Sequence, residues 1–467
     1  MKTDSFHPEL SGKRRTIMKK NIRILALVLA LLMAAVFMTG CSGNTEKPNQ
    51  TGNNSGSESG TNPGNNDSNK TLGIRPAVGT GTMTAGDIEL AYIESMNAFA
   101  AALVRNMGED WTGVISPVSF AMMLELLANG AGPQEQSEIL NALMLNMGIK
   151  PTDENAARLI AALNKAFKDI TKKDAAEVGK NKSDSKLSLM TAIIVGDGDK
   201  FNTVFEGNAA DYFNASVGNV DFRDTQKALE VINGWVSENT NGLIPRLFDN
   251  IPVDTVMALV NALYFKADWA KPFTVFRGSM GFKGLNGEMM TSMLSCTDQF
   301  RYGKFDGNQI VLVPYANSSF YMAVVLPAEG TTANEALASS FDLYTRCSEA
   351  TVELIMPAVQ LSTKFDALEY MEGLGLPGLA NRDMLFGNII DDGPVFLTQF
   401  VHAAVLNVTE FGTEAAAATG VTGTKNAATI TGDVISVICD RPYAMAIVDG
   451  NTGAILFASV VNDLPTA

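Results

Sequence analysis

The chain contains few residues that could carry out acid–base or nucleophilic catalysis. It has two histidines, and His7 lies in an N-terminal segment that we expect to be removed, so His402 is the one imidazole left to titrate near neutral pH. A catalytic triad needs a nucleophile and an orienting acid beside its base, and no GxSxG nucleophile motif occurs. His402 stands in the apolar stretch VHAAVLNV, which favours a buried histidine held by hydrogen bonds. We therefore expect that the protein is not an enzyme.

The acidic residues and cysteines do not have the spacing of a metal site. Asp391-Asp392 precedes Gly393-Pro394, and Asp197-Gly198-Asp199 lacks the rest of a calcium loop, so both are interpreted as turns. Apart from Cys41, the cysteines are Cys296, Cys347 and Cys439. Their odd number, without CxxC or CxxH spacing, indicates neither a disulfide framework nor a zinc site. We expect no metal and no cofactor.

The N-terminus has the features of an export signal. Seven Lys or Arg residues precede an unbroken apolar run of 15 residues, Ile24 to Met38. This length suits the hydrophobic region of a secretory signal and is short for a membrane span. The run ends in MTGC, which resembles a bacterial lipobox with Cys41 as the lipidated residue; the alternatives are a simple anchor helix and an ordinary cleaved signal. Residues 1–40 are predicted to be the signal peptide.

A flexible tether is predicted between the signal and the folded domain. Residues 41–80 are rich in Asn, Gly, Ser and Thr and contain few apolar residues. Acyl chains on Cys41 would anchor the protein to a membrane, and the tether would hold the domain away from it. We expect an exported protein that is lipid-anchored at the cell surface or extracellular. Its net charge of −15 argues against a nucleic-acid partner.

Residues 81–467 form one domain in which helical patterns precede strand patterns. Apolar residues at helical spacing predict helices over Asp87–Arg105 and Gln226–Asn241. Ser116-Pro117 provides a capping hydroxyl and a first-turn proline for a helix that ends at Gly130. Seven later stretches predict strands: VMALVNALYF, QIVLVPY, FYMAVVLP, TVELIMPAV, VFLTQFVHAAVLNV, YAMAIV and AILFASVV. The pattern predicts an α+β fold.

The stretch TEFGTEAAAATGVTGT, residues 409–424, suits neither a helix nor a strand at rest. Its alanines are bracketed by glycines that leave room for fewer than two helical turns. As a strand it has almost no large side chain to pack.

Several motifs, in order along the chain, resemble those of the serpin family. ISPVSFAMMLELLANGAG resembles the second serpin helix, and LVNALYFKADWAKPF resembles the central-sheet strand with its Lys and Trp motif. The other matching segments are INGWVSENTNGLI, VLVPYANSSFYMAVVLP, VELIMPAV, VHAAVLNVTEFGTEAAAAT and RPYAMAIVDGNTGAILFASVVNDLP. The resemblance spans residues 84 to 467. It implies three β-sheets, about eight to nine helices and an exposed reactive-centre loop.

The resemblance implies a suicide-substrate inhibitor of serine proteases. A protease would cut the loop, the severed part would insert as a strand into the central sheet, and the acyl-linked protease would be trapped. The loop's hinge would consist of Glu410, Gly412, Thr413, Glu414, Ala415, Ala416, Ala417, Ala418 and Thr419. Strand alternation places Thr413, Ala415, Ala417, Thr419 and Val421 on one face. None of these is charged, as insertion between packed strands requires.

His402 gains a non-catalytic role from the resemblance. Together with Ser116, Ser119 and Asn261 it matches the family's shutter, where the central sheet opens, and we expect these polar groups to be fully hydrogen-bonded. The sequence also departs from the family at three places: Phe411, Met190-Thr191-Ala192, and the glycines Gly420 and Gly423. These departures bear on how efficiently the loop would insert.

The scissile bond follows from counting along the loop as in the family. The count places it at Asn426-Ala427, and a hinge shorter by one residue places it at Lys425-Asn426. Small residues from Val421 to Ala428 would suit elastase-like or subtilisin-like proteases, whereas Lys425 would suit a trypsin-like protease. The expected partner is thus a serine protease, and the inhibitor is expected to be a monomer.

A non-inhibitory serpin that acts as a binding or chaperone-like module is the alternative function. Hinges of such serpins commonly carry bulky, charged or proline residues, whereas this one carries four consecutive alanines. A secreted hydrolase is a third class, and the single usable histidine argues against it.

Overall fold

The computed structural model describes the folded domain and leaves several segments undescribed. The described residues are 75–76, 89–144, 161, 164, 186–240, 242, 244–316, 318–413 and 433–465. All of them belong to the unit Asn66–Ala467. The predicted signal peptide, Cys41, most of the tether and residues 414–432 of the predicted loop lie outside the described residues.

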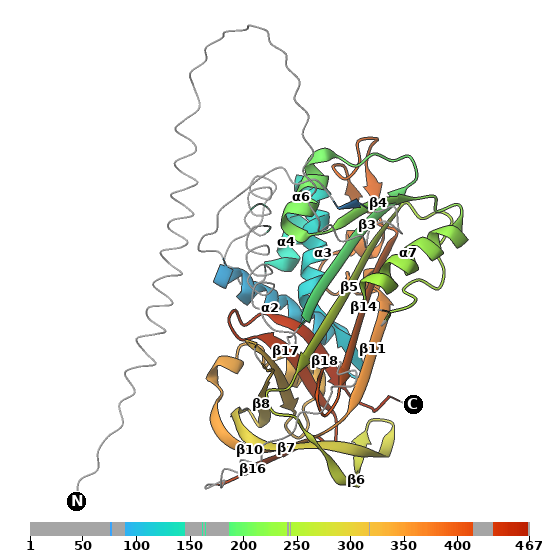
Figure 1. Cartoon of the computed structure of the whole chain (residues 1–467). Helices are drawn as coiled ribbons and strands as arrows, with labels where there is room; N and C mark the ends of the chain where they lie inside the picture. Colours follow the sequence, from blue (N-terminus) through green and yellow to red (C-terminus); the bar gives the residue numbers. More distant parts are fainter. Residues whose placement is uncertain are drawn as a thin grey trace, which may run out of the picture. The chain divides into compact units, whose positions relative to one another are not determined.

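The described part contains seven α-helices, which largely precede the main run of strands (Figure 1). They are α2 (Glu89–Asn106), α3 (Pro117–Gly130), α4 (Pro133–Leu143), α6 (Thr203–Phe213), α7 (Thr225–Asn239), α8 (Ala333–Ala338) and α9 (Pro377–Ala380). Ser116 caps α3, because its Oγ accepts a hydrogen bond from the Ser119 amide, and Pro117 occupies the first turn. None of the described helices is both long and apolar enough to span a membrane.

A seven-stranded sheet forms the centre of the domain. Its order is β1 (Arg75–Pro76), β4 (Ser216–Val220), β3 (Lys186–Gly196), β5 (Met257–Asp268), β15 (Gly412–Thr413), β14 (Gln399–Val408) and β11 (Val359–Asp366). Helix α3 lies on one face and α7 on the other (Figure 1). Because both faces are covered, β5 is apolar on both sides, and each face packs into its own core.

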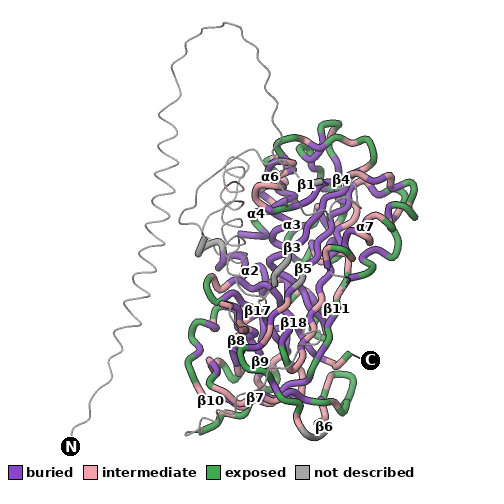
Figure 2. The backbone as a smooth tube through the Cα atoms, in the orientation of Figure 1, coloured by how far each residue is buried: buried purple, intermediate pink, exposed green. Residues whose placement is uncertain are grey.

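A second sheet has nine strands and lies toward the other end of the domain. The path runs β16 (Ile435–Ile438), β10 (Ser348–Pro357), β7 (Gly287–Phe305), β8 (Asn308–Pro314), β9 (Phe320–Leu326), β17 (Tyr443–Asp449), β18 (Ile455–Val461) and β2 (Gly113–Ile115), and β6 (Thr274–Gly284) pairs with β7. Strands β17 and β18 are buried throughout (Figure 2). A third sheet consists of β12 (Leu385–Phe386) and β13 (Val395–Phe396).

The structure confirms the predicted α+β class and the positions of the main elements. The three predicted helices correspond to α2, α3 and α7, with ends displaced by no more than two residues. One predicted strand, VFLTQFVHAAVLNV, is divided into β13 and β14, because the Thr398 side chain and backbone bond to Met257 at the start of β5. Asp197-Gly198 and Asp391-Asp392 form turns, as expected.

Candidate functional site: the opening of the central sheet

The two central strands of the large sheet are neighbours along only part of their length. Residues 258–263 of β5 pair directly and in parallel with residues 399–404 of β14. Farther along, β15 lies between them, antiparallel to both, so that Thr413 faces Ala267 of β5 and Val408 of β14. We call the directly paired stretch the closed section. We call the place where β15 lies between the two strands the fork.

The turn that leads from β14 into β15 is fixed by three backbone carbonyl groups. The amide of Trp269 donates to the Phe411 carbonyl, and its indole Nε1 donates to the Thr409 carbonyl, both at 2.9 Å. The amide of Phe273 donates to the Glu410 carbonyl at 2.8 Å. The chain segment that follows β5 therefore holds the base of the predicted hinge.

Gly412 lies too close to the backbone of β5 for any side chain. A Cβ at this position would collide with the carbonyl oxygen of Ala267 and with the Cα of Asp268. Glycine is the residue that permits such a close approach of two backbones. The close approach of the two backbones therefore explains why the predicted hinge has glycine at position 412.

Thr413 is seated in the sheet with its side chain buried. It is 1% exposed, and its hydroxyl lies 2.6 Å from the hydroxyl of Tyr315. The Tyr315 ring stacks on Trp269, with 4.5 Å between ring centroids. Burial raises the pKa of Tyr315 well above its usual range, so the phenol stays protonated and can donate or accept a hydrogen bond.

The four predicted shutter residues lie together, buried next to the closed section. His402 of β14 lies directly opposite Asn261 of the neighbouring strand β5, and both are fully buried. The Nε2 of His402 accepts a hydrogen bond from the Ser116 backbone amide at 3.2 Å, and the Ser116 hydroxyl donates to the Ser119 hydroxyl. Asn261 donates instead to the Thr191 hydroxyl at 2.9 Å, so these residues form a cluster with two separate branches.

The expectation that this cluster is fully hydrogen-bonded was wrong. Within the described part of the chain, His402 Nδ1 and Asn261 Oδ1 are buried and have no hydrogen-bond partner. The closed section leaves no group between them, because their two strands pair directly there. Since Nε2 of His402 accepts a bond, the proton of the neutral ring is on Nδ1, which leaves one donor and one acceptor unused.

The environment of His402 keeps its imidazole neutral. The ring packs between Phe120 and Phe365, with centroid distances of 4.7 and 5.6 Å. Burial lowers the pKa of His402 to about 3. A neutral ring with one nitrogen already bonded to a backbone amide suits a structural histidine.

Sequence reasoning missed one member of the cluster, and other predicted site residues lie outside the described residues. Thr191 was noted only as part of an unusual strand sequence, and its place opposite Asn261 identifies it as the partner of that amide. Phe411, another place where the sequence departs from the family, is 41% exposed and so does not obstruct the sheet. The predicted scissile bonds around Asn426 and the hinge from Glu414 to Thr419 lie outside the described residues.

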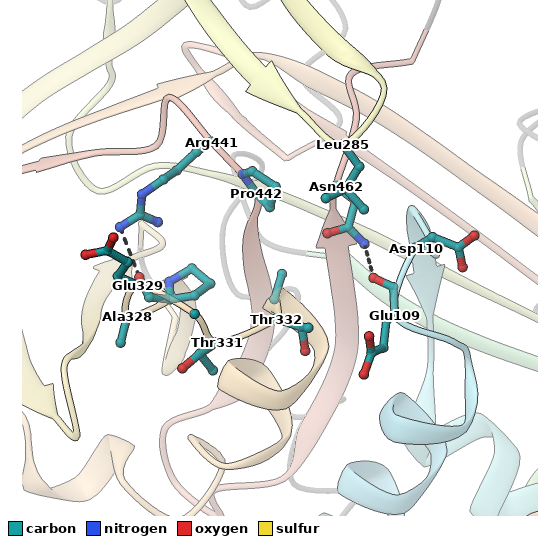
Figure 3. A pocket seen from close by; sticks show the side chains of 13 residues that line it. Glu109, Asp110, Leu285, Ala328, Glu329, Thr331, Thr332, Arg441, Pro442 and Asn462 are labelled. Atoms are coloured by element: carbon teal, nitrogen blue, oxygen red, sulfur yellow. Dashed lines mark hydrogen bonds between the residues drawn. The ribbon is translucent and has the colours of Figure 1, made fainter.

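The structure also contains an open cavity of about 740 Å³, which is separate from the fork and the shutter residues (Figure 3). It is lined among others by Glu109, Glu329, Thr332, Arg441 and Asn462. Arg441 donates to the Pro327 carbonyl at 3.0 Å, and Asn462 donates to the Glu109 carbonyl at 3.0 Å. No predicted site residue lines this cavity.

The other chemistry-bearing side chains of the described residues are dispersed or inert. No group of three or more His, Cys, Asp or Glu side chains is placed there to hold a metal. Cys296, Cys347 and Cys439 are buried and unpaired. Burial raises the pKa of the Cys296 thiol to about 11, so it is not a reactive thiolate at neutral pH.

Comparison with known proteins agrees with this geometry. The family model described as "Serpin (serine protease inhibitor)" matches residues 94–464. The chain is a serpin. Human neuroserpin is 28% identical over 374 residues, which cover 76% of this chain and 86% of neuroserpin. An uncharacterized serpin-like protein of Thermococcus kodakarensis is 27% identical and covers 92% of this chain and 97% of its own.

Solved structures show the same fold at low sequence identity. The thermophilic serpin tengpin in its native state aligns with a TM-score of 0.72 and 24% identity, covering 83% of this chain and 98% of tengpin. Human thyroxine-binding globulin in complex with thyroxine aligns with a TM-score of 0.68 and 22% identity, covering 81% and 100%. As a serpin, this chain belongs to a family of protease inhibitors rather than enzymes, in which serine proteases are the typical targets.

Proposed function

We propose that this serpin inhibits serine proteases as a suicide substrate. The serine of the protease would attack the carbonyl of Asn426, or of Lys425 in the alternative register, so that the peptide bond breaks, an ester forms and the proton passes to the leaving amine. The freed N-terminal part of the loop would then enter the large sheet. The observation that carries this proposal is the fork: β15 is already the start of a strand between β5 and β14.

Continuing the register of β15 supports the insertion of the predicted hinge. Thr413 faces Ala267 and Val408, so an antiparallel strand that runs on from it would bring residue 419 opposite Asn261 and His402. The intervening residues on that face are Ala415 and Ala417, which are small enough to slide between packed strands. This strand would replace the direct pairing of the closed section.

The two unused polar atoms of the shutter give further support. In that register residue 419 is a threonine, whose hydroxyl can donate one hydrogen bond and accept another. It would lie between His402 Nδ1, which needs an acceptor, and Asn261 Oδ1, which needs a donor. Satisfying two buried groups would favour the inserted state.

The target class and the location of the inhibitor are proposed from the sequence. Val421 to Ala428 would suit elastase-like or subtilisin-like proteases, and Lys425 a trypsin-like protease. Export and lipidation of Cys41 would place the inhibitor at the cell surface. Replacement of Cys41 by serine should then release the protein from the membrane fraction of the producing cell, and retention of the variant in that fraction would contradict the anchor.

A non-inhibitory binding role is the alternative, since a structural neighbour was solved with bound thyroxine. The small uncharged residues of the hinge favour inhibition, because a binding protein has no need of them. To distinguish the two, the protein is mixed with elastase, subtilisin and trypsin, and the products are separated on a denaturing gel. Inhibition predicts a covalent complex of the two masses. Cleavage without any complex, together with no gain in thermal stability of the cut protein, would exclude it.

A further inference from the structure

A two-part cover lies over the α7 face of the closed section. It consists of α7 and the residues 244–251 that follow it, and its buried residues share a core with β5 and β14. Asn233 joins the two parts: its side chain accepts from the amides of Leu247 and Phe248, both at 2.8 Å, and donates to the Phe248 carbonyl at 2.9 Å. The cover therefore behaves as one unit above the place where a new strand would enter.

An ion pair links this cover to the half of the sheet that contains β14 and β11. Asp249 of the cover bonds to the Nζ of Lys364 at 2.5 Å. Lys364 belongs to β11, where it faces Ala403 of β14, and Ala403 in turn faces Ala262 of β5. The ion pair thus reaches across the junction of β5 and β14, beside the last rungs of the closed section.

The covalent chain attaches the cover to one half of the sheet only. Before α7 the chain comes from β4, and after residue 251 it leads into β5, whereas Lys364 belongs to the half that contains β14 and β11. A strand inserted between β5 and β14 would displace these halves by about 4.8 Å, the spacing of neighbouring strands. That displacement exceeds the reach of an ion pair unless the cover moves as well.

We propose that the pair Lys364–Asp249 is a clip that holds the large sheet closed and slows the entry of a strand between β5 and β14. The inference rests on the proposed function, because it concerns the rate of the insertion that inhibition requires. The side chains are 37% and 67% exposed, and exposed pairs contribute up to about 1 kcal/mol, or about fivefold in a rate. The clip would thus adjust the rate of insertion without preventing it, and salt would weaken it.

The test measures how fast the intact protein takes up a synthetic peptide of its own hinge, GTEAAAATGVTGT, followed by native gel and by the rise in melting temperature. Lys364→Met and Asp249→Asn should each incorporate the peptide about two to five times faster than wild type. The double variant should be no faster than Asp249→Asn alone, because Lys364→Met removes only the shared interaction. Asp249→Asn also removes the pair with Arg246 within the cover. Raising NaCl should accelerate wild type and leave the variants unchanged.

Glu335→Gln serves as the matched control. It removes another exposed ion pair, with Arg105, which joins α2 to α8 away from the sheet opening, and it should leave the rate unchanged. Equal rates in wild type and Lys364→Met would overturn the clip, and so would equal acceleration by Glu335→Gln. If no variant takes up the peptide and cleavage brings no thermal stabilisation, the proposed function fails and the clip fails with it.

Discussion

The fork and the closed section are neighbouring parts of one strand junction, and they are built in opposite ways. At the fork, β15 is seated by the turn's bonds to Trp269 and Phe273 and by the contact of Thr413 with Tyr315. At the closed section, β5 and β14 pair directly, and two buried polar atoms have no partner. One part already has the arrangement that the inserted sheet would have throughout, and the other lacks it.

In the proposed mechanism, part of the driving force for strand insertion would come from the closed section. A buried donor or acceptor without a partner destabilises the fold by about 1–3 kcal/mol, and the closed section contains one of each. The fork has no comparable defect among its described residues. An inserted strand would extend the hydrogen-bonded arrangement of the fork into the closed section. Once the loop is cut, strand insertion is therefore expected to proceed from the fork toward the closed section.

The largest effect is expected from a charge at the fork. Thr413→Arg would place a cation where the present side chain is 1% exposed, and an unpaired buried charge is destabilising by several kcal/mol. The seated residues should leave the sheet, and the serpin should become a substrate with at least about a hundredfold less covalent complex. The gel assay with an inhibited protease measures this. An unchanged amount of covalent complex would show that inhibition does not require an uncharged side chain at position 413.

The second-largest effect is expected at the closed section, from removal of the shutter histidine. His402→Ala would lose contacts with Phe120 and Phe365 and leave the Ser116 amide unpaired, a loss of about 3 kcal/mol. The sheet should then open prematurely, by insertion of the uncut loop or by polymerisation. Size-exclusion chromatography after mild heating would detect both. A variant that stays monomeric and as inhibitory as wild type would refute the role.

Acid should weaken the closed section through the same residue. Its pKa is about 3 in the folded protein and about 6.5 when unfolded, so the neutral ring's contribution is complete above pH 6.5 and is lost as the pH falls toward 3. Between pH 7.5 and 4.5 this histidine should account for about 3 kcal/mol of lost stability. Urea unfolding of wild type and His402→Gln at both pH values isolates the difference. Equal losses in the two proteins would contradict it.

The smallest effect concerns the hydroxyl contact at the fork. Tyr315→Phe keeps the stack on Trp269 and removes one hydrogen bond to Thr413, for about 1 kcal/mol. Thr413→Val removes the other partner, and a double-mutant cycle on the melting temperature gives the coupling. We expect a coupling near that value. Additive effects would show that the two hydroxyls do not stabilise each other.

Much of the fold followed from the sequence, whereas the state of the sheet did not. The capping Ser116-Pro117 and the apolar runs predicted elements that the structure confirms, because helix caps and buried strands have local signals. Alternation placed Thr413 on the face expected to enter the sheet after insertion, whereas its burial in β15 of the uncut protein was not predicted. Neither the partner of Asn261, Thr191, nor the unpaired Nδ1 of His402 could be predicted, since both depend on which strands are neighbours across the junction.

The melting temperature of the serpin before and after a single cut in the segment 414–432 tests the central claim most directly. Subtilisin or trypsin can make the cut, and mass spectrometry locates it. If the cut loop extends β15 through the closed section, the cleaved serpin should melt tens of degrees higher than the intact one, because a full strand with its hydrogen bonds is added. A cleaved serpin that melts at or below the temperature of the intact protein would contradict insertion.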